Sequence, residues 1–303
     1  MNQSSLCALA CLLICSLAFA SLAQVGQSDL TAVLQQASNR RQEYIETFKD
    51  LTAVETKTTE LFDKNGKIEK QRKVVSDFLV YPLQTRTCAV DEIRITREVD
   101  GKPVGKGEKQ AIELFQKLAN SKNSEQEVKR LRDENLKYTL KYYRWGITLQ
   151  PVTALAKEAQ PGHSFEIAGQ ESLGGRKVIL LKYQLNEVSP STSNLVRTFT
   201  NPRVGKRGRI WLDAENFRVW RWENEYTVVD RDITSAAVYM RDEIEYVSSA
   251  FGILVPKTIV TSFFDKSEPD KRSLRLTGRI TYNYDAFKRF DVSAESEVPK
   301  LRN

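Results

Sequence analysis

The stretch RIWLDAENFRVWRWENEYTVV, residues 209–229, is the segment that decides the fold class. Two runs in which apolar and polar residues alternate lie on either side of residues 214–216, which form a short turn-like segment. Alternation with a period of two is typical of β-strands that have one buried and one exposed face. We therefore predict a β-hairpin with strands over Arg209–Asp213 and Phe217–Val229.

Similar strand patterns extend to both sides of this hairpin. Turn-forming residues separate them at 63–66, at 100–101 and at 174–175. The continuous apolar run Val178–Leu181 indicates a central strand that is covered on both faces. The other expected strands are Leu51–Phe62, Ile68–Leu83, Thr87–Val99, Ser164–Ala168, Lys177–Leu185, Val238–Ser248, Ile253–Phe264 and Ser273–Tyr284.

Helical spacing occurs in two places. Residues 29–49 carry apolar residues three and four positions apart, which predicts an amphipathic helix with Ser28 as its N-cap. Residues 105–160 form a helical insertion between two groups of strands, with a charged segment at 124–135 and a further helix from Pro151 through Ala159. This distribution predicts an α+β fold with one curved antiparallel sheet and helices on one side.

The first 23 residues indicate export. They contain no Asp, Glu, Lys or Arg, and residues 6–20 are almost wholly apolar. Small residues follow, so we expect a signal peptide over residues 1–23 and a single domain over residues 24–303. Three of the four cysteines lie in that segment, which leaves Cys88 unable to form an internal disulfide. Export without a disulfide favours a bacterial periplasm or cell surface.

The composition limits the classes of protein that need to be considered. The chain has 303 residues, 41% hydrophobic and 28% charged, with a formal net charge of +7. These fractions exclude a disordered tail and a polytopic membrane protein. The positive charge favours anionic lipid headgroups or envelope polymers as counterparts, or simply a basic surface, and nucleic acid is not expected as a partner of an exported protein.

Residues with catalytic or metal-binding chemistry are few. His163 is the single histidine and Cys88 the single cysteine beyond the signal segment, so a zinc site is not expected. The sequence has no G-x-S-x-G elbow, no G-x-G-x-x-G and no P-loop. We therefore expect a protein that is not an enzyme and has no cofactor and no metal, while a hydrolase that uses a pair of carboxylates stays a minor alternative.

Two features suggest a ligand site. Trp220, Trp222 and Tyr226 alternate along one strand and should share one face, either as an aromatic wall for an acyl chain or a sugar, or as ordinary core. The loop over residues 187–207 contains Leu195 and Phe199 among cationic residues. That loop could form the entrance to a cavity or fold back onto the sheet.

The chain resembles the LolA/LolB-like superfamily of periplasmic lipoprotein carriers, in a poorly characterised exported bacterial branch. The resemblance rests on residues 175–185, on the hairpin at 209–223, and on Tyr246 followed by Gly252–Pro256. It implies an unclosed β-barrel with helices packed on its concave side and a hydrophobic cavity for acyl chains. The chain is longer than such carriers usually are, and no individual functional residue is transferred.

Two functions therefore stay open. In the first, the chain is a non-enzymatic envelope protein that binds a lipid or the acyl chains of a lipoprotein in the barrel cavity, with peripheral contact to a membrane. The candidate contacts are Trp220, Trp222, Tyr226, Leu195 and Phe199. In the second, side chains fill the barrel, and the chain is an envelope module that binds an acidic protein or polymer.

Overall fold

The structure of the protein is a computed structural model. It describes residues 29–48, 51–82, 90–104, 113–114, 124–144, 146–148, 153–191, 195–196, 201–230, 233–266 and 274–289. The expected signal peptide, Cys88, Phe199 and most of residues 105–123 of the expected helical insertion lie outside these ranges.

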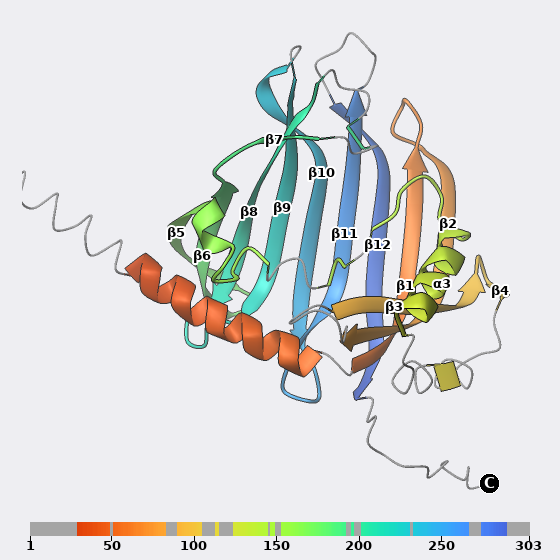
Figure 1. The fold of residues 1–303 in the computed structure, drawn as a ribbon, viewed down its shortest axis with the longest axis horizontal. Coiled ribbons are helices and arrows are strands. Elements are labelled where there is room, and N and C mark those ends of the chain that lie inside the picture. Colours follow the sequence, from red (N-terminus) through yellow and green to blue (C-terminus); the bar gives the residue numbers. More distant parts are fainter. Residues whose placement is uncertain are drawn as a thin grey trace, which may run out of the picture.

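One antiparallel sheet of twelve strands makes up most of the described part of the chain (Figure 1). Its strand order is β4-β3-β2-β1-β12-β11-β10-β9-β8-β6-β5, and β7 pairs with β8 beside this path. The strands are β1 (Leu51–Phe62), β2 (Ile68–Pro82), β3 (Val90–Val99), β4 (Lys102–Pro103), β5 (His163–Leu173), β6 (Arg176–Leu185), β7 (Ser189–Pro190), β8 (Arg203–Asp213), β9 (Val219–Asp230), β10 (Ile233–Ser248), β11 (Leu254–Lys266) and β12 (Leu274–Arg289).

The sheet does not close into a barrel. Strands β4 and β5 form its two ends, and no hydrogen-bonded ladder joins them among the described residues. Near the β2–β3 end the strands curl across the front of the sheet (Figure 1). The predicted unclosed, curved antiparallel sheet is therefore confirmed.

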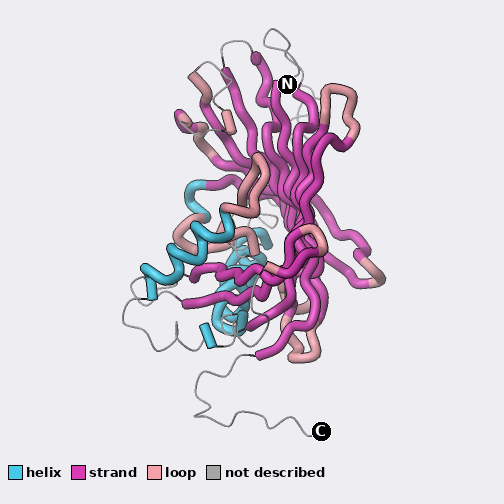
Figure 2. Tube along the Cα trace, turned by 90° about the vertical axis from the view of Figure 1, so that its right-hand side faces the viewer, coloured by secondary structure: helices cyan, strands magenta, loops and turns pink. Residues whose placement is uncertain are grey.

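Two helices are described over most of their length, and both lie on the same side of the sheet (Figure 2). The predicted N-terminal helix covers residues 29–48, and its apolar stripe places Val33, Ala37 and Phe48 in the main core. Helix α3 (Ser124–Leu136) packs beside β3, where Val128 and Leu131 join a smaller apolar cluster with Leu79 and Ile93 on β2 and β3.

The position of strand β6 differs from the prediction that it is a central strand. Its apolar run is covered on both faces, as expected, because Ile179 and Leu181 belong to the main core while Val178 and Leu180 pack with Trp211 on the opposite face. The strand is not central, however, since only β5 separates it from the end of the sheet. The sequence pattern of β6 is that of a central strand because both of its faces are buried. One face packs on the main core, and the other packs on the separate cluster around Trp211.

The helix predicted from Pro151 through Ala159 is wrong for the residues described. Residues 153–159 form successive turns, and the 3-10 helix η2 (Gln160–Gly162) follows them. Leu155 is fully buried and Ala154 and Ala156 are nearly so. Burial of three consecutive side chains against the core is incompatible with one stripe of a regular helix, so tertiary packing overrides the local propensity.

Candidate functional site: a cleft between the N-terminal helix and the sheet

Strand β9 brings two of the predicted ligand contacts, Trp222 and Tyr226, to one face. Trp222 has no exposed surface, and its indole Nε1 donates a hydrogen bond to the Tyr183 hydroxyl at 3.0 Å. Tyr226 lies four positions along on the same face and packs, half-buried, against the same core. Trp220 also contacts that core, but the β8–β9 ladder is irregular there: Arg221 is opposite Trp211 and Val219 is opposite Leu212, so the predicted alternation is interrupted before Trp220. Trp222 is thus a core residue in this structure, and its role as a ligand contact stays a prediction.

Polar partners hold the two flanking rings in place. Trp220 donates from Nε1 to Asp213 at 3.1 Å, and the Arg176 guanidinium lies 4.1 Å from the centre of the Trp220 ring. The Tyr226 hydroxyl accepts a long hydrogen bond of 3.4 Å from Arg144. Leu195 packs against the main core, as expected for a loop that folds back onto the sheet. Phe199 lies outside the described residues.

The interior of the sheet contains a buried charged cluster that the sequence analysis missed. Arg94 on β3 donates from Nε to Glu55 on β1 at 2.7 Å and lies 3.0 Å from Glu92. Glu92 also accepts hydrogen bonds from the backbone N–H groups of Gly146 and Thr148, at 3.1 and 2.7 Å. Burial opposes the charge of Arg94, but the two carboxylates hold its pKa well above its usual range.

A strap of chain, defined here as residues 141–144 and 146–148, crosses the interior. The Tyr142 ring stacks on Phe263 with their centres 4.1 Å apart, and Arg144 donates to the fully buried Asp242 at 2.5 Å. Ile147 is fully buried. Burial raises the pKa of Asp242, and the attraction of Arg144 opposes that rise. The strap and the aromatic core cover part of the concave side of the sheet.

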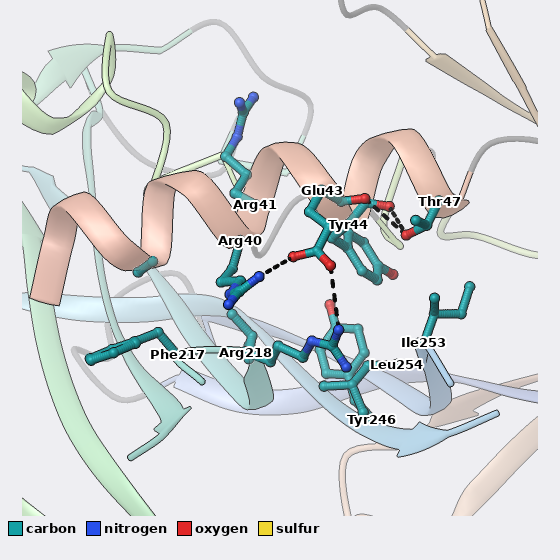
Figure 3. Close-up of a pocket in the computed structure, with 12 residues that line it drawn as sticks. Arg40, Arg41, Glu43, Tyr44, Thr47, Phe217, Arg218, Tyr246, Ile253 and Leu254 are labelled. Carbon is teal, nitrogen blue, oxygen red and sulfur yellow. Dashed lines mark hydrogen bonds and ion pairs between the residues drawn. The ribbon is translucent and has the colours of Figure 1, made fainter. Parts of the chain in front are cut away.

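A cleft remains where the N-terminal helix crosses the ends of β9, β10 and β11 (Figure 3). Helix residues Ala37 and Tyr44 form one wall, and the other is formed by Tyr246 and Leu254 on the sheet together with Phe217 in the turn before β9. The cavity volume is about 40 Å³, enough for a few water molecules. The remaining lining residues are Arg40, Arg41, Glu43, Thr47, Arg218, Val219 and Ile253.

The turn before β9 holds an aromatic ring at this cleft under strain. Phe217 has a φ of 59°, in the left-handed region, which costs a residue other than glycine about 1–2 kcal/mol. Asp213 stabilises the turn by accepting hydrogen bonds from the N–H groups of Glu215 and Asn216 at 2.9 and 3.1 Å. Strained backbone that the surrounding structure enforces is common at ligand sites.

The rim of the cleft is charged. Glu43 lies between two arginines, at 2.6 Å from Arg40 on the same helix and at 3.4 Å from Arg218 on the sheet side (Figure 3). The hydrogen bond from Arg40 holds the pKa of Glu43 below its usual range, against the opposing effect of burial. Arg41 points away from these groups on the other side of the helix (Figure 3).

Sequence reasoning found the apolar stripe of this helix but not the cleft. The signal that could have indicated the rim is Arg40-x-x-Glu43, a spacing at which two helix residues meet. Arg218 could not have been found in this way, since only the fold brings it to the helix. His163 lies at the start of β5 with its Nδ1 at 2.9 Å from the carbonyl oxygen of Ala159, and outside the cleft.

Two further observations concern the described ranges alone. No group of three or more His, Cys, Asp or Glu side chains is arranged there to hold a metal ion. None of the helices described there is both long and apolar enough to cross a membrane.

Comparison with known proteins gives a likeness of fold. No protein-family model matches the sequence, and no curated protein matches it. Among solved structures, an outer membrane lipoprotein-sorting protein domain from Vibrio parahaemolyticus aligns at 12% identity and a TM-score of 0.38, over 87% of this chain and 94% of its own. A DUF1329 family protein from Desulfovibrio piger aligns at 12% identity and a TM-score of 0.37, over 88% of this chain and 94% of its own.

A LolA superfamily protein from Nitrosomonas europaea aligns at 11% identity and a TM-score of 0.31, over 86% of this chain and 93% of its own. This name belongs to the superfamily that the sequence resembles. At such low identity and similarity, these structures transfer no residue role, ligand or partner to this chain.

Proposed function

We propose that this chain is a non-enzymatic protein of the bacterial cell envelope that binds an amphiphilic molecule, a lipid or the acyl chains of a lipoprotein. The binding site is the cleft between helix 29–48 and the sheet. The observation that carries the proposal is the chemistry of this cleft, in which Phe217, Tyr246 and Leu254 form a largely apolar wall beside a charged rim. An acyl chain gains about 0.8 kcal/mol for each CH₂ group that it buries.

The cleft must widen to admit a chain, because its present volume holds a few water molecules. Helix 29–48 contacts the core through side chains such as Val33, Ala37 and Phe48. Its backbone hydrogen bonds are internal to the helix, so moving it breaks no ladder of the sheet. Widening at Val219 would lead towards Trp222, one of the contacts that the sequence predicts.

Export directs the protein to its ligand. Residues 1–23 have the pattern of a signal peptide, so the proposed location is the periplasm or the cell surface of a bacterium. Peripheral contact with a membrane would deliver lipids to the cleft, and the net charge of +7 favours an anionic surface.

A second candidate follows from the filled interior. Trp222, Phe78 and Ile244 have no exposed surface, and the strap covers part of the same face. Such an interior favours an envelope module that binds an acidic protein or polymer by charge. Charge-driven binding weakens steeply with salt, whereas burial of an acyl chain does not. The two candidates therefore differ in the salt dependence of binding.

The test is a titration of the purified protein with N-phenyl-1-naphthylamine, a neutral apolar dye that fluoresces when it is buried. We expect saturable binding that salt does not weaken. The variant Ile253→Glu places a charge on the half-buried wall of the cleft and should weaken binding at least tenfold, equivalent to about 1.4 kcal/mol. Thr47→Trp fills the cleft from the helix side and should have the same effect.

Val247→Glu is the matched control, because Val247 lies near the same end of β10 with 41% of its surface exposed and does not line the cleft. It should bind the dye like the wild type. Absence of saturable binding by the wild type, or equal binding by all four folded proteins, would exclude the cleft as an amphiphile site. Binding of an acidic polymer that salt abolishes would favour the second candidate.

A further inference from the structure

The two arginines at the rim of the cleft are held in place independently of the carboxylate between them. Arg40 donates from Nε to the carbonyl oxygen of Asn216 at 3.1 Å, and Arg218 donates to the carbonyl oxygen of Gly252 at 3.2 Å. Loss of Glu43 would therefore leave both guanidinium groups anchored to backbone oxygens of the turns before β9 and β11. Two guanidinium groups at a fixed separation are a preorganised receptor for an oxyanion.

Charge at the rim is unbalanced. Glu43 contributes one negative charge against the two positive charges of Arg40 and Arg218. The carboxylate is partly open to solvent, with 42% of its side chain exposed, so a competing anion from solution can reach it. The interaction with each arginine is of the modest strength of surface ion pairs, about 0.2–1 kcal/mol.

A second, independent observation lies deeper in the same cleft. The Tyr44 and Tyr246 side chains point into it (Figure 3), and their buried hydroxyl groups interact with each other and have no other hydrogen-bond partner among the described residues. Tyr246 is 7% exposed. In a pair of hydroxyl groups that bond only to each other, one O–H donor stays unused, and an oxygen atom of a ligand would accept from it.

We propose that Glu43 occupies the position of a ligand carboxylate, and that the cleft selects long-chain carboxylic acids over neutral amphiphiles by binding their headgroup between Arg40 and Arg218. The inference rests on the proposed function and names the ligand class for the same site. The aromatic and aliphatic wall of Phe217, Tyr246 and Leu254 contacts the alkyl chain, and the ligand carboxylate replaces that of Glu43. Glu43 thereby lowers the affinity of the site for its own ligand.

The experiment measures displacement of N-phenyl-1-naphthylamine by three ligands with the same sixteen-carbon chain: palmitate, hexadecanol and hexadecyl phosphate. Wild-type protein should bind palmitate at least threefold more tightly than hexadecanol. In Glu43→Gln the affinity for palmitate should rise about three- to fivefold, and in Arg218→Gln it should fall by a similar factor, while hexadecanol is unaffected in both. Hexadecyl phosphate distinguishes selection of a carboxylate from selection of any oxyanion.

Two matched controls keep the outcome specific. Glu46→Gln removes a carboxylate from an exposed position one turn along the same helix, outside the cleft, and Arg130→Gln removes an exposed arginine from α3. Neither should change the preference for palmitate. Equal affinities for palmitate and hexadecanol, or tighter binding of hexadecyl phosphate than of palmitate, would overturn the carboxylate assignment while leaving the amphiphile site intact. Failure of the dye itself to bind would instead overturn the proposed function.

Discussion

Lys57 carries an ammonium group into the interior of the sheet. It follows Glu55 on the inward-facing positions of β1 and is 9% exposed. Burial lowers its pKa to about 8, with Arg94 and Arg72 adding to the decrease and Glu55 opposing it. The neighbouring ion cluster of Arg94 and Glu55 thus leaves Lys57 as a poorly compensated buried charge.

Replacement of Lys57 by Met should therefore stabilise the protein at pH 7. In the wild type the pKa of Lys57 is lower in the folded state, about 8, than in the unfolded state, about 10.4. The unfolded state then binds more protons between these values, so the stability of the wild type rises with pH across this window. Lys57→Met should raise the free energy of unfolding at pH 7 by about 1–3 kcal/mol.

The measurement is urea unfolding at pH 7, 9 and 10.5 on wild type, Lys57→Met and Lys70→Met. Lys70 is exposed on β2, and its replacement should change stability little at any pH. The advantage of Lys57→Met should shrink as the pH rises. A variant that is less stable than the wild type at pH 7 would show that the attraction to Glu55 outweighs the cost of burial.

At the scale of elements, the strap depends on a glycine in β12. A Cβ atom at Gly278 would overlap the Tyr142 ring, which stacks on Phe263 and bonds through its hydroxyl to Thr277 at 2.7 Å. The absence of a side chain at position 278 therefore creates the space in which the first anchor of the strap sits. The other anchors, Asp242 and Glu92, come from β10 and β3.

Replacement of Gly278 by Ala should loosen the strap. Overpacking of this kind costs about 1–3 kcal/mol, and hydrogen exchange at the Gly146 and Thr148 amides should accelerate because the strap docks less tightly on Glu92. Thermal unfolding and amide exchange measure the two effects. Gly162→Ala is the control, since a Cβ atom there meets nothing within 4 Å. Unchanged exchange at both amides would show that the anchor at Tyr142 does not hold the strap.

At the scale of the whole molecule, the strands share one sheet and a main core that extends across it. That core joins Phe78 on β2, Ile210 on β8 and Phe48 on the N-terminal helix into one cluster. Elements from both ends of the sheet therefore depend on the same buried surface. Such continuity favours a single cooperative unit, and the single domain expected over residues 24–303 stays a prediction.

We expect Phe78→Ala and Ile210→Ala each to lower the temperature of one shared unfolding transition. The cost should be about 2–5 kcal/mol in each variant, because both side chains are fully buried. Differential scanning calorimetry, compared with near- and far-ultraviolet circular dichroism, tests whether the transitions coincide. A second transition that stays at its wild-type temperature in one variant would contradict a single unit and divide the sheet into two.

Local patterns made the strands predictable. Period-two alternation in residues 209–229 and turn residues such as Gly101 and Gly175 specify strand and turn with no knowledge of distant partners. Strand β1 has the predicted bounds, and most other strands differ by a few residues. The common face of Trp222 and Tyr226 follows from the same alternation, which an irregularity of the β8–β9 ladder interrupts at Trp220.

The sequence by itself determined which segments are strands, which residues share a face, and where the amphipathic helix lies, because each of these depends on neighbours within a few positions. Tertiary structure decided the rest. It placed β6 next to the end of the sheet, turned residues 153–159 away from a helix, and brought Arg218 beside Glu43. Contacts between distant segments depend on how the whole sheet curves and on which apolar surfaces are buried against one another. A sequence pattern that repeats every two to four residues contains no information about such contacts.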